Sequence, residues 1–283
     1  MTTNTYLKQV NPHVRDQHIQ FEENGHKYTI LTDSNSKYTS VTTWNHSLFP
    51  HFDADLIIEK MMTGKGWKEG HKYWGLTPEQ IKDLWNINRD NAAGAGTKLH
   101  YDIECFMNQR PPKTTAATHA DLLKFFTDSR SLSLRSSPPP QEWLYFLQFV
   151  ENTPYMRPYR TEWMIYDEDL KLAGSIDMVY ENEDGTLSIF DWKRAKEINP
   201  ENAFHKYAMT SCIQHIPDSN YWHYALQLNT YKAILERKYD KVIKDLYLVR
   251  LHPESPQQTF ELIEVPDLSK EIRNLFELRL STI

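Results

Sequence analysis

Apolar and polar residues alternate most clearly in the second half of the chain. Two apolar runs there flank the turn Glu-Asn-Glu-Asp-Gly, which ends at Gly185. An Asp-Gly turn between two short alternating runs is typical of a β-hairpin. Comparable runs precede and follow this hairpin. The pattern therefore predicts strands at 159–166, 172–180, 187–192 and 244–250.

Apolar residues recur at helical spacing on both sides of these strands. Residues 96–107 carry an apolar stripe, and His100 and Glu104 share another face of the same predicted helix. Thr77 followed by Pro78 is typical of a helix start. Helices are predicted at 40–49, 53–62, from 77 to about 87, and at 96–107, 119–128, 141–150 and 220–238, with a short hairpin at 18–31.

This order of elements suggests three parts. Residues 1–93 are expected to form a hairpin and helices that cover a core. Residues 94–265 are expected to form that core, with a loop-rich insertion at about 111–140, and residues 266–283 a C-terminal helix. Within the core the order is helix, three strands, helix, strand. It predicts an α/β fold in which helices flank a mixed sheet.

Composition narrows the class of protein. With 283 residues, of which 40% are hydrophobic and 13% aromatic, the chain can bury a substantial core. No segment approaches the roughly 18–20 apolar residues of a membrane span, so no membrane partner is expected. The first residues lack a signal-peptide pattern and the two cysteines are far apart, so we expect an intracellular protein of the cytoplasm or nucleus, not a secreted one. A net charge of -6 disfavours binding of nucleic acid over the whole surface but leaves room for a local basic groove.

Three charged residues of the predicted hairpin carry the candidate chemistry. Asp191 and Lys193 are two apart on one strand, so their side chains point to the same face. Asp177, on the neighbouring strand, can reach them. Two carboxylates and an ammonium group on one patch of sheet suit a divalent metal ion and an activated water at a phosphodiester.

Four short motifs follow one another along the predicted elements. They are Gly96-x-x-x-His100, Gly174-x-x-Asp177, Asp191-x-Lys193 and Gln227-x-x-x-Tyr231. In this order they resemble the PD-(D/E)XK nuclease superfamily, whose core is α-β-β-β-α-β. The similarity is to its RecB-like branch, which includes mitochondrial genome-maintenance exonucleases and homologues from large DNA viruses. It covers roughly residues 94–252.

The resemblance implies a monomeric, metal-dependent nuclease that hydrolyses DNA in replication, recombination or repair. The implied substrate is single-stranded DNA, attacked from an end. A structure-specific endonuclease and a non-catalytic nucleic-acid-binding member of the fold stay open as alternatives. The implied ligands of Mg²⁺ or Mn²⁺ are His100, Asp177, Asp191 and the backbone carbonyl of Trp192. The implied catalytic residues are Asp177, Asp191, Lys193, Gln227 and Tyr231.

Several further residues have two interpretations each. Glu162 is a candidate acid beside the metal, and Glu104 is either a solvated helix residue or another functional acid. Aromatic residues either belong to the core or stack on bases; these are Trp67, Trp74, Trp222 and His223. Basic residues form either a solvated patch or phosphate contacts; these are Arg160, Arg194 and Lys196.

Overall fold

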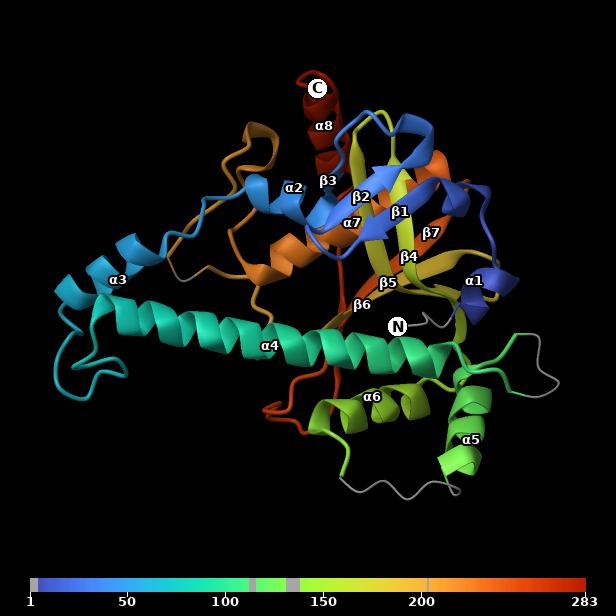
Figure 1. Cartoon of the computed structure of the whole chain (residues 1–283), viewed down its shortest axis with the longest axis horizontal. Coiled ribbons are helices and arrows are strands. Elements are labelled where there is room, and N and C mark those ends of the chain that lie inside the picture. The colour runs from blue at the N-terminus through green and yellow to red at the C-terminus, as the bar shows by residue number, and fades with distance from the viewer. Residues whose placement is uncertain (1–4, 112–115, 131–137, 203) are drawn as a thin grey trace.

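The computed structural model describes residues 5–111, 116–130, 138–202 and 204–283. These residues form a mixed α/β fold in which helices flank a mixed six-stranded sheet (Figure 1). A small separate hairpin of β1 (Ile19–Glu22) and β2 (Lys27–Ile30) lies near the edge of that sheet. The predicted α/β class with a mixed, helix-flanked sheet is therefore confirmed.

The main sheet contains the four predicted strands and two that the sequence did not predict. Its strands are β3 (Thr39–Ser40), β4 (Arg157–Asp167), β5 (Leu172–Glu181), β6 (Leu187–Lys193), β7 (Ile243–Arg250) and β8 (Glu261–Glu264). The order is β3-β5-β6-β7-β8, and β4 pairs with β5. The β3–β5 and β6–β7 pairs are parallel, whereas the other pairs are antiparallel. The unpredicted strands, β3 and β8, are short, so they have little periodicity of their own.

Helices cover both faces of the sheet. They are α1 (Tyr6–Val10), α2 (Val41–Ser47), α3 (Ala54–Thr63), α4 (Pro78–Met107), α5 (His119–Arg130), α6 (Gln141–Asn152), α7 (Asn220–Lys238) and α8 (Ser269–Leu280), with 3₁₀ turns at Val14–His18, Leu31–Asp33 and Ser211–Ile213. One hydrophobic cluster joins α2, α7 and α8 to the sheet. A second joins α4, α5 and α6 to the opposite face (Figure 1). None of the helices in the described segments is long and apolar enough to cross a membrane.

Helix α4 is a single helix of 30 residues where the sequence suggested two. Thr77 and Gln80 form a reciprocal capping box at its start, and the predicted Pro78 occupies the first turn. The helix runs on through Gly94 and Gly96, although each glycine costs about 0.5–1 kcal/mol relative to alanine in a helix. The predicted boundary between residues 93 and 94 thus lies inside one element, and α4 extends well beyond the sheet (Figure 1).

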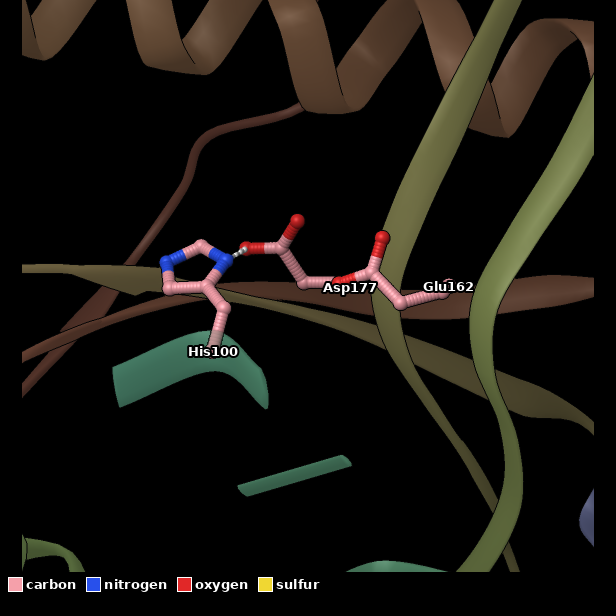
Figure 2. A group of neighbouring side chains, drawn as sticks. All are labelled: His100, Glu162 and Asp177. Atoms are coloured by element: carbon pink, nitrogen blue, oxygen red, sulfur yellow. Dashed lines mark ion pairs between the residues drawn. The ribbon is translucent and has the colours of Figure 1, made fainter. Parts of the chain in front are cut away.

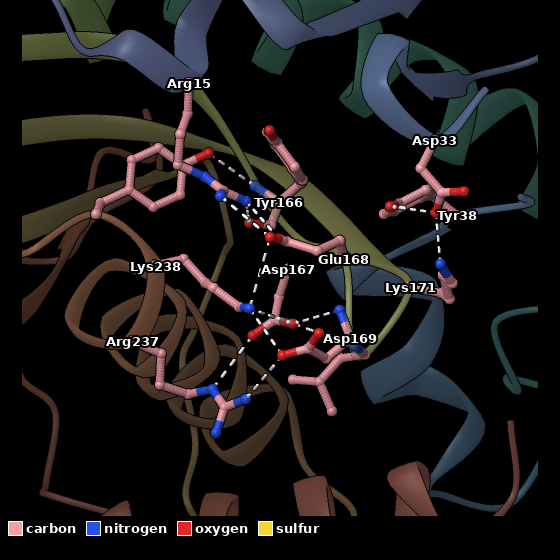
Figure 3. Close-up of polar contacts among 12 residues, drawn as sticks. Arg15, Asp33, Tyr38, Tyr166, Asp167, Glu168, Asp169, Lys171, Arg237 and Lys238 are labelled. Atoms are coloured by element: carbon pink, nitrogen blue, oxygen red, sulfur yellow. Dashed lines mark hydrogen bonds and ion pairs between the residues drawn. The ribbon is translucent and has the colours of Figure 1, made fainter.

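Ion pairs attach the N-terminal segment to the sheet at the turn between β4 and β5 (Figure 3). The Arg15 guanidinium lies 3.9 Å above the Tyr166 ring, which orients it toward the turn. The same turn binds the end of α7, so it joins three parts of the chain. The pairs are Arg15–Glu168, Asp33–Lys171, Arg237–Asp167 and Lys238–Asp169.

Candidate metal centre

Three carboxylate residues occupy one row across three neighbouring strands. In the β4–β5 ladder, the residues on either side of Glu162 pair with those on either side of Asp177, so these two acids lie opposite each other. The last pair of the β5–β6 ladder joins Met178 to Phe190. The next position along this ladder places Asp177 opposite Asp191. Residues directly opposite on adjacent strands have neighbouring side chains, so the register brings all three acids together.

The row lies where the regular ladder breaks. The Asp177 carboxylate accepts a hydrogen bond from the backbone N–H of Trp192 at 3.0 Å, in place of a strand-to-strand bond. Glu162 has a φ of +43°, in the left-handed region that non-glycine residues rarely occupy. Such a conformation costs about 1–3 kcal/mol and persists where the surroundings enforce it, often at functional sites. The carboxylate row therefore coincides with an irregular stretch of backbone.

Helix α4 brings His100 to this row. Its Nε2 is 3.0 Å from the carbonyl oxygen of Trp192. A carbonyl only accepts hydrogen bonds, so Nε2 carries the proton, and in the neutral imidazole Nδ1 has the lone pair. Nδ1 faces Asp177 Oδ2 at 3.5 Å (Figure 2). In this neutral form the lone pair and the carboxylate oxygen repel each other, so a cation between them, either a proton or a metal ion, is favoured.

His100, Glu162 and Asp177 form a donor set suited to a divalent metal ion (Figure 2). One ligand atom from each lies within 4.8 Å of the others. A nitrogen and two carboxylate oxygens fit Mn²⁺ well, and carboxylates also fit Mg²⁺. The set contains the predicted ligands His100 and Asp177 and the candidate acid Glu162, but not the predicted ligand Asp191, which pairs with Lys193. The predicted Trp192 carbonyl lies at the same place but is engaged with the His100 ring.

The electrostatics of the row also favour a bound cation. Burial, followed by the charge of Asp177, raises the pKa of Glu162. Burial likewise raises the pKa of Asp191, an effect that Lys193 partly opposes. Buried carboxyl groups with raised pKa values stay protonated unless another positive charge takes the place of the proton. A divalent ion would supply that charge.

Lys193 projects from the end of β6 beside the carboxylates. Its Nζ is 2.5 Å from Asp191 Oδ2 and 4.3 Å from the centre of the Tyr224 ring. Burial lowers the pKa of Lys193, but the nearby charges of Asp191 and Asp177 outweigh this effect and raise it overall. Lys193 therefore stays an ammonium group. The sequence did not single out Tyr224 as its contact, although this residue is one turn before the predicted Gln227.

The predicted pair Gln227 and Tyr231 lies on α7 over the same part of the sheet. Gln227 Nε2 donates a hydrogen bond to the Tyr231 hydroxyl at 3.2 Å. The Tyr231 ring rests on Gly174, where a Cβ atom would approach Tyr231 Cε1 to 2.7 Å. Glycine at this position is therefore explained by close packing, three residues before Asp177.

Glu104 is buried, so its interpretation as a solvated helix residue is wrong. Burial raises the pKa of its carboxyl group. It lies one helical turn after His100 and lines a cavity of about 100 Å³ together with Glu162, Asn108 and Arg160. Glu104 on α4 thus places a further acid beside Glu162 of the carboxylate row.

Arg160 does not lie where a DNA phosphate could reach it. It is 2% exposed, and its guanidinium pairs with Asp16 at 2.8 Å and donates to the backbone oxygen of Asn11. The guanidinium of Arg160 also lies 4.6 Å from the centre of the Trp163 ring, which shields it further from solvent. The predicted phosphate contact at Arg160 is therefore corrected to a structural ion pair that fixes the N-terminal segment to β4.

The other two candidate basic residues lie beyond the end of β6, on the Lys193 side. Arg194 Nε donates to Glu142 at 2.8 Å and is partly buried, whereas Lys196 is exposed and pairs with Glu254 at 2.9 Å. Exposed pairs of this kind contribute little and exchange readily. Lys196 is accordingly the more accessible candidate for a phosphate.

The two aromatic candidates on α7 are held by contacts within the protein. Trp222 donates its indole N–H to the Pro200 carbonyl at 3.0 Å. His223 bonds to Asp218 at 2.9 Å and lies against the Phe49 ring, with centroids 4.1 Å apart. These contacts favour the interpretation of both as packing residues.

No protein-family model matches this chain, and a search of curated proteins finds no match. Any functional assignment therefore depends on the residues and geometry described above.

Proposed function

We propose that this protein is a metal-dependent nuclease that hydrolyses DNA phosphodiester bonds. The observation that carries the proposal is the row Glu162, Asp177 and Asp191 across three adjacent strands, with His100 above it and Lys193 beside it. Acids, an imidazole and an ammonium group are brought together from three strands and one helix. A structural ion pair would not require so many like charges in one place.

We further propose that the core is of the PD-(D/E)XK type. The succession α4, β4, β5, β6, α7, β7 agrees with the expected α-β-β-β-α-β order, with α5 and α6 inserted after α4. All four motifs also lie on the elements where that fold would have them. The support is thus topological as well as chemical.

The proposed ligands for Mg²⁺ or Mn²⁺ are His100 Nδ1 and the carboxylates of Glu162 and Asp177. The Trp192 carbonyl and Asp191 are the remaining predicted ligands, and Asp191 also holds Lys193 in place. When bound, the ion supplies a water of lowered pKa and neutralises charge that develops on the phosphate.

Lys193 has a separate task in this proposal. Its ammonium group, fixed by Asp191 and the Tyr224 ring, lies beside the ligands without being one of them. It can therefore stabilise the charge on the phosphate oxygens or orient the attacking water. Gln227 and Tyr231 support β5 from α7 through the Gly174 contact.

The test is digestion of DNA with Mn²⁺ or Mg²⁺ by the wild type and by Lys193→Ala. Loss of one donor to the transition state often costs about 10²-fold or more in rate. Lys244→Ala is a matched control, because this lysine is exposed at the start of β7 and lies away from the row. Near-normal turnover by Lys193→Ala would remove Lys193 from the mechanism.

Whether cleavage needs a free strand end is tested by comparing linear and circular single strands of equal sequence. The proposed exonuclease degrades linear single strands and spares both circles and blunt duplexes. Equal rates on circles and linear strands would establish the endonuclease alternative instead. Metal binding without any cleavage would favour the non-catalytic alternative.

A further inference from the structure

An aromatic cluster lies at the far end of α4, away from the metal centre. We define the aromatic arm as the loop 64–76 between α3 and α4, together with Phe52 and Trp85. Trp85 donates its indole N–H to the Tyr73 hydroxyl at 3.0 Å. The Trp67 ring lies 5.7 Å from that of Trp74, between centroids. The arm is therefore an ordered arrangement of rings.

These rings are not explained by burial. Phe52 is 64% exposed and Trp74 is 48% exposed. In the described part of the chain, the loop aromatics belong to none of the hydrophobic clusters. The interpretation of Trp67 and Trp74 as core residues is therefore not supported. Exposed apolar patches of this kind commonly mark binding sites.

The charge of the loop indicates what it binds. Three exposed lysines, Lys65, Lys68 and Lys72, accompany a single acid, Glu69, although the whole chain has a net charge of -6. Within the described segments, none of the three lysines pairs with a carboxylate. Lys72 instead lies 5.0 Å from the centre of the Tyr73 ring. Lysines without a carboxylate partner, interleaved with exposed and half-buried rings, match a polyanion that carries flat, stackable groups.

We propose that the aromatic arm binds single-stranded DNA, with its rings stacked on unpaired bases and its lysines on the phosphates. Such surfaces combine base stacking with electrostatic attraction and need no particular sequence. The inference rests on the proposed nuclease function, because it assigns to the arm the strand whose phosphodiester is cut at the metal centre.

Helix α4 sets the distance between the arm and the metal centre. Trp85 and His100 are on this one helix, roughly 15 residues apart, which corresponds to about 22 Å at 1.5 Å per residue. A stacked strand advances about 3.4 Å per nucleotide, so the interval spans about six or seven nucleotides. A stacked oligonucleotide shorter than this interval cannot occupy both places at once.

The experiment compares the affinity of fluorescently labelled oligo-dT of about 5 and about 20 nucleotides, in EDTA so that no cleavage occurs. Trp74→Ala should raise Kd for the longer strand by roughly 5- to 150-fold, the range expected for loss of one stacked base. The shorter strand, which can occupy only one of the two places, should bind the wild type more weakly than the longer strand does. Tyr155→Ala is the matched control, because Tyr155 is an aromatic residue of 72% exposure outside the arm.

The lysines are tested through salt dependence. Replacing Lys68 and Lys72 together by Gln should reduce the slope of log K against log salt for the longer strand by about 1.4, or about 0.7 for each phosphate that is no longer neutralised. An unchanged slope would overturn the proposed phosphate contacts. Wild-type affinity of Trp74→Ala for the longer strand would overturn the proposed stacking.

Three further outcomes separate this inference from its alternatives. Weaker DNA binding by Trp74→Ala that is accompanied by a lowered Tm would show a general effect on the fold and would overturn the assignment. Binding of phosphatidylserine vesicles that requires Trp74, without any effect on DNA, would overturn it in favour of a lipid surface. Length-dependent DNA binding without metal-dependent cleavage would retain the arm and reject the nuclease proposal.

Discussion

Replacing Glu162 by glutamine tests the carboxylate row directly. The change keeps the size of the side chain and removes one negative charge. Because burial and Asp177 raise the pKa of Glu162 above its ordinary value of 4.5, the metal-free native state holds a proton that the unfolded state has released. The free energy of unfolding therefore falls as pH rises from about 4.5 to about 8. Glu162→Gln should remove the part of this decrease that Glu162 causes.

The magnitude follows from proton linkage. One proton gives a slope of at most about 1.4 kcal/mol per pH unit, or about 2 kcal/mol between pH 6.5 and about pH 8. For a chain of 283 residues, with an unfolding entropy of about 2.1 cal/mol/K per residue, this corresponds to roughly 3 °C in Tm. The window begins at 6.5 because above this pH the buried His119 is neutral in the unfolded state as well as in the native state, so it no longer contributes to the slope.

The assay is thermal unfolding in EDTA and then with Mn²⁺, at several pH values. Glu162→Gln should be the more stable protein at about pH 8 without metal and should gain less stability from Mn²⁺ than the wild type. Glu181→Gln, the same change at an exposed position on β5, is the control. Parallel stability curves for wild type and Glu162→Gln, or an equal gain from Mn²⁺, would refute the reasoning.

Three further predictions concern the support of the site. Gly174→Ala should destabilise the fold by about 1–3 kcal/mol, because its Cβ would lie 2.7 Å from Tyr231 Cε1; a second change, Tyr231→Leu, should recover part of that stability in denaturant titrations. Burial lowers the pKa of His119 to about 3, so the unfolded state binds a proton that the native state does not; stability should fall by up to about 1.4 kcal/mol per unit as pH drops below 6.5, and His119→Gln should flatten this dependence in acid unfolding curves. Asp167→Ala should cost about 1–3 kcal/mol, measured by urea unfolding, because its buried carboxylate accepts the backbone N–H of Leu170 and pairs with Arg237; an effect below about 0.5 kcal/mol would show that the β4–β5 turn does not depend on this carboxylate.

The sequence alone determined the main strands, helix α7 and the common face of Asp191 and Lys193. Strand and helix periodicity depends on neighbours along the chain, so strands at 159–166, 172–180, 187–192 and 244–250 were predictable and lie within β4 to β7. The spacing of Asp191 and Lys193 likewise fixed a common face, and the two side chains contact each other. These predictions needed only the pattern of residues that are close together in the sequence.

Only the tertiary structure decided how these residues meet. The placement of Glu162 opposite Asp177 depends on strand register and on a left-handed backbone, neither of which has a local sequence signal. The burial of Arg160 and Glu104 depends on segments far away in the chain. The continuity of α4 also overrides the break that its glycines suggested, because capping at the start and burial of the C-terminal half stabilise one helix. Periodicity is a property of neighbours in sequence, whereas a site is made of neighbours in space.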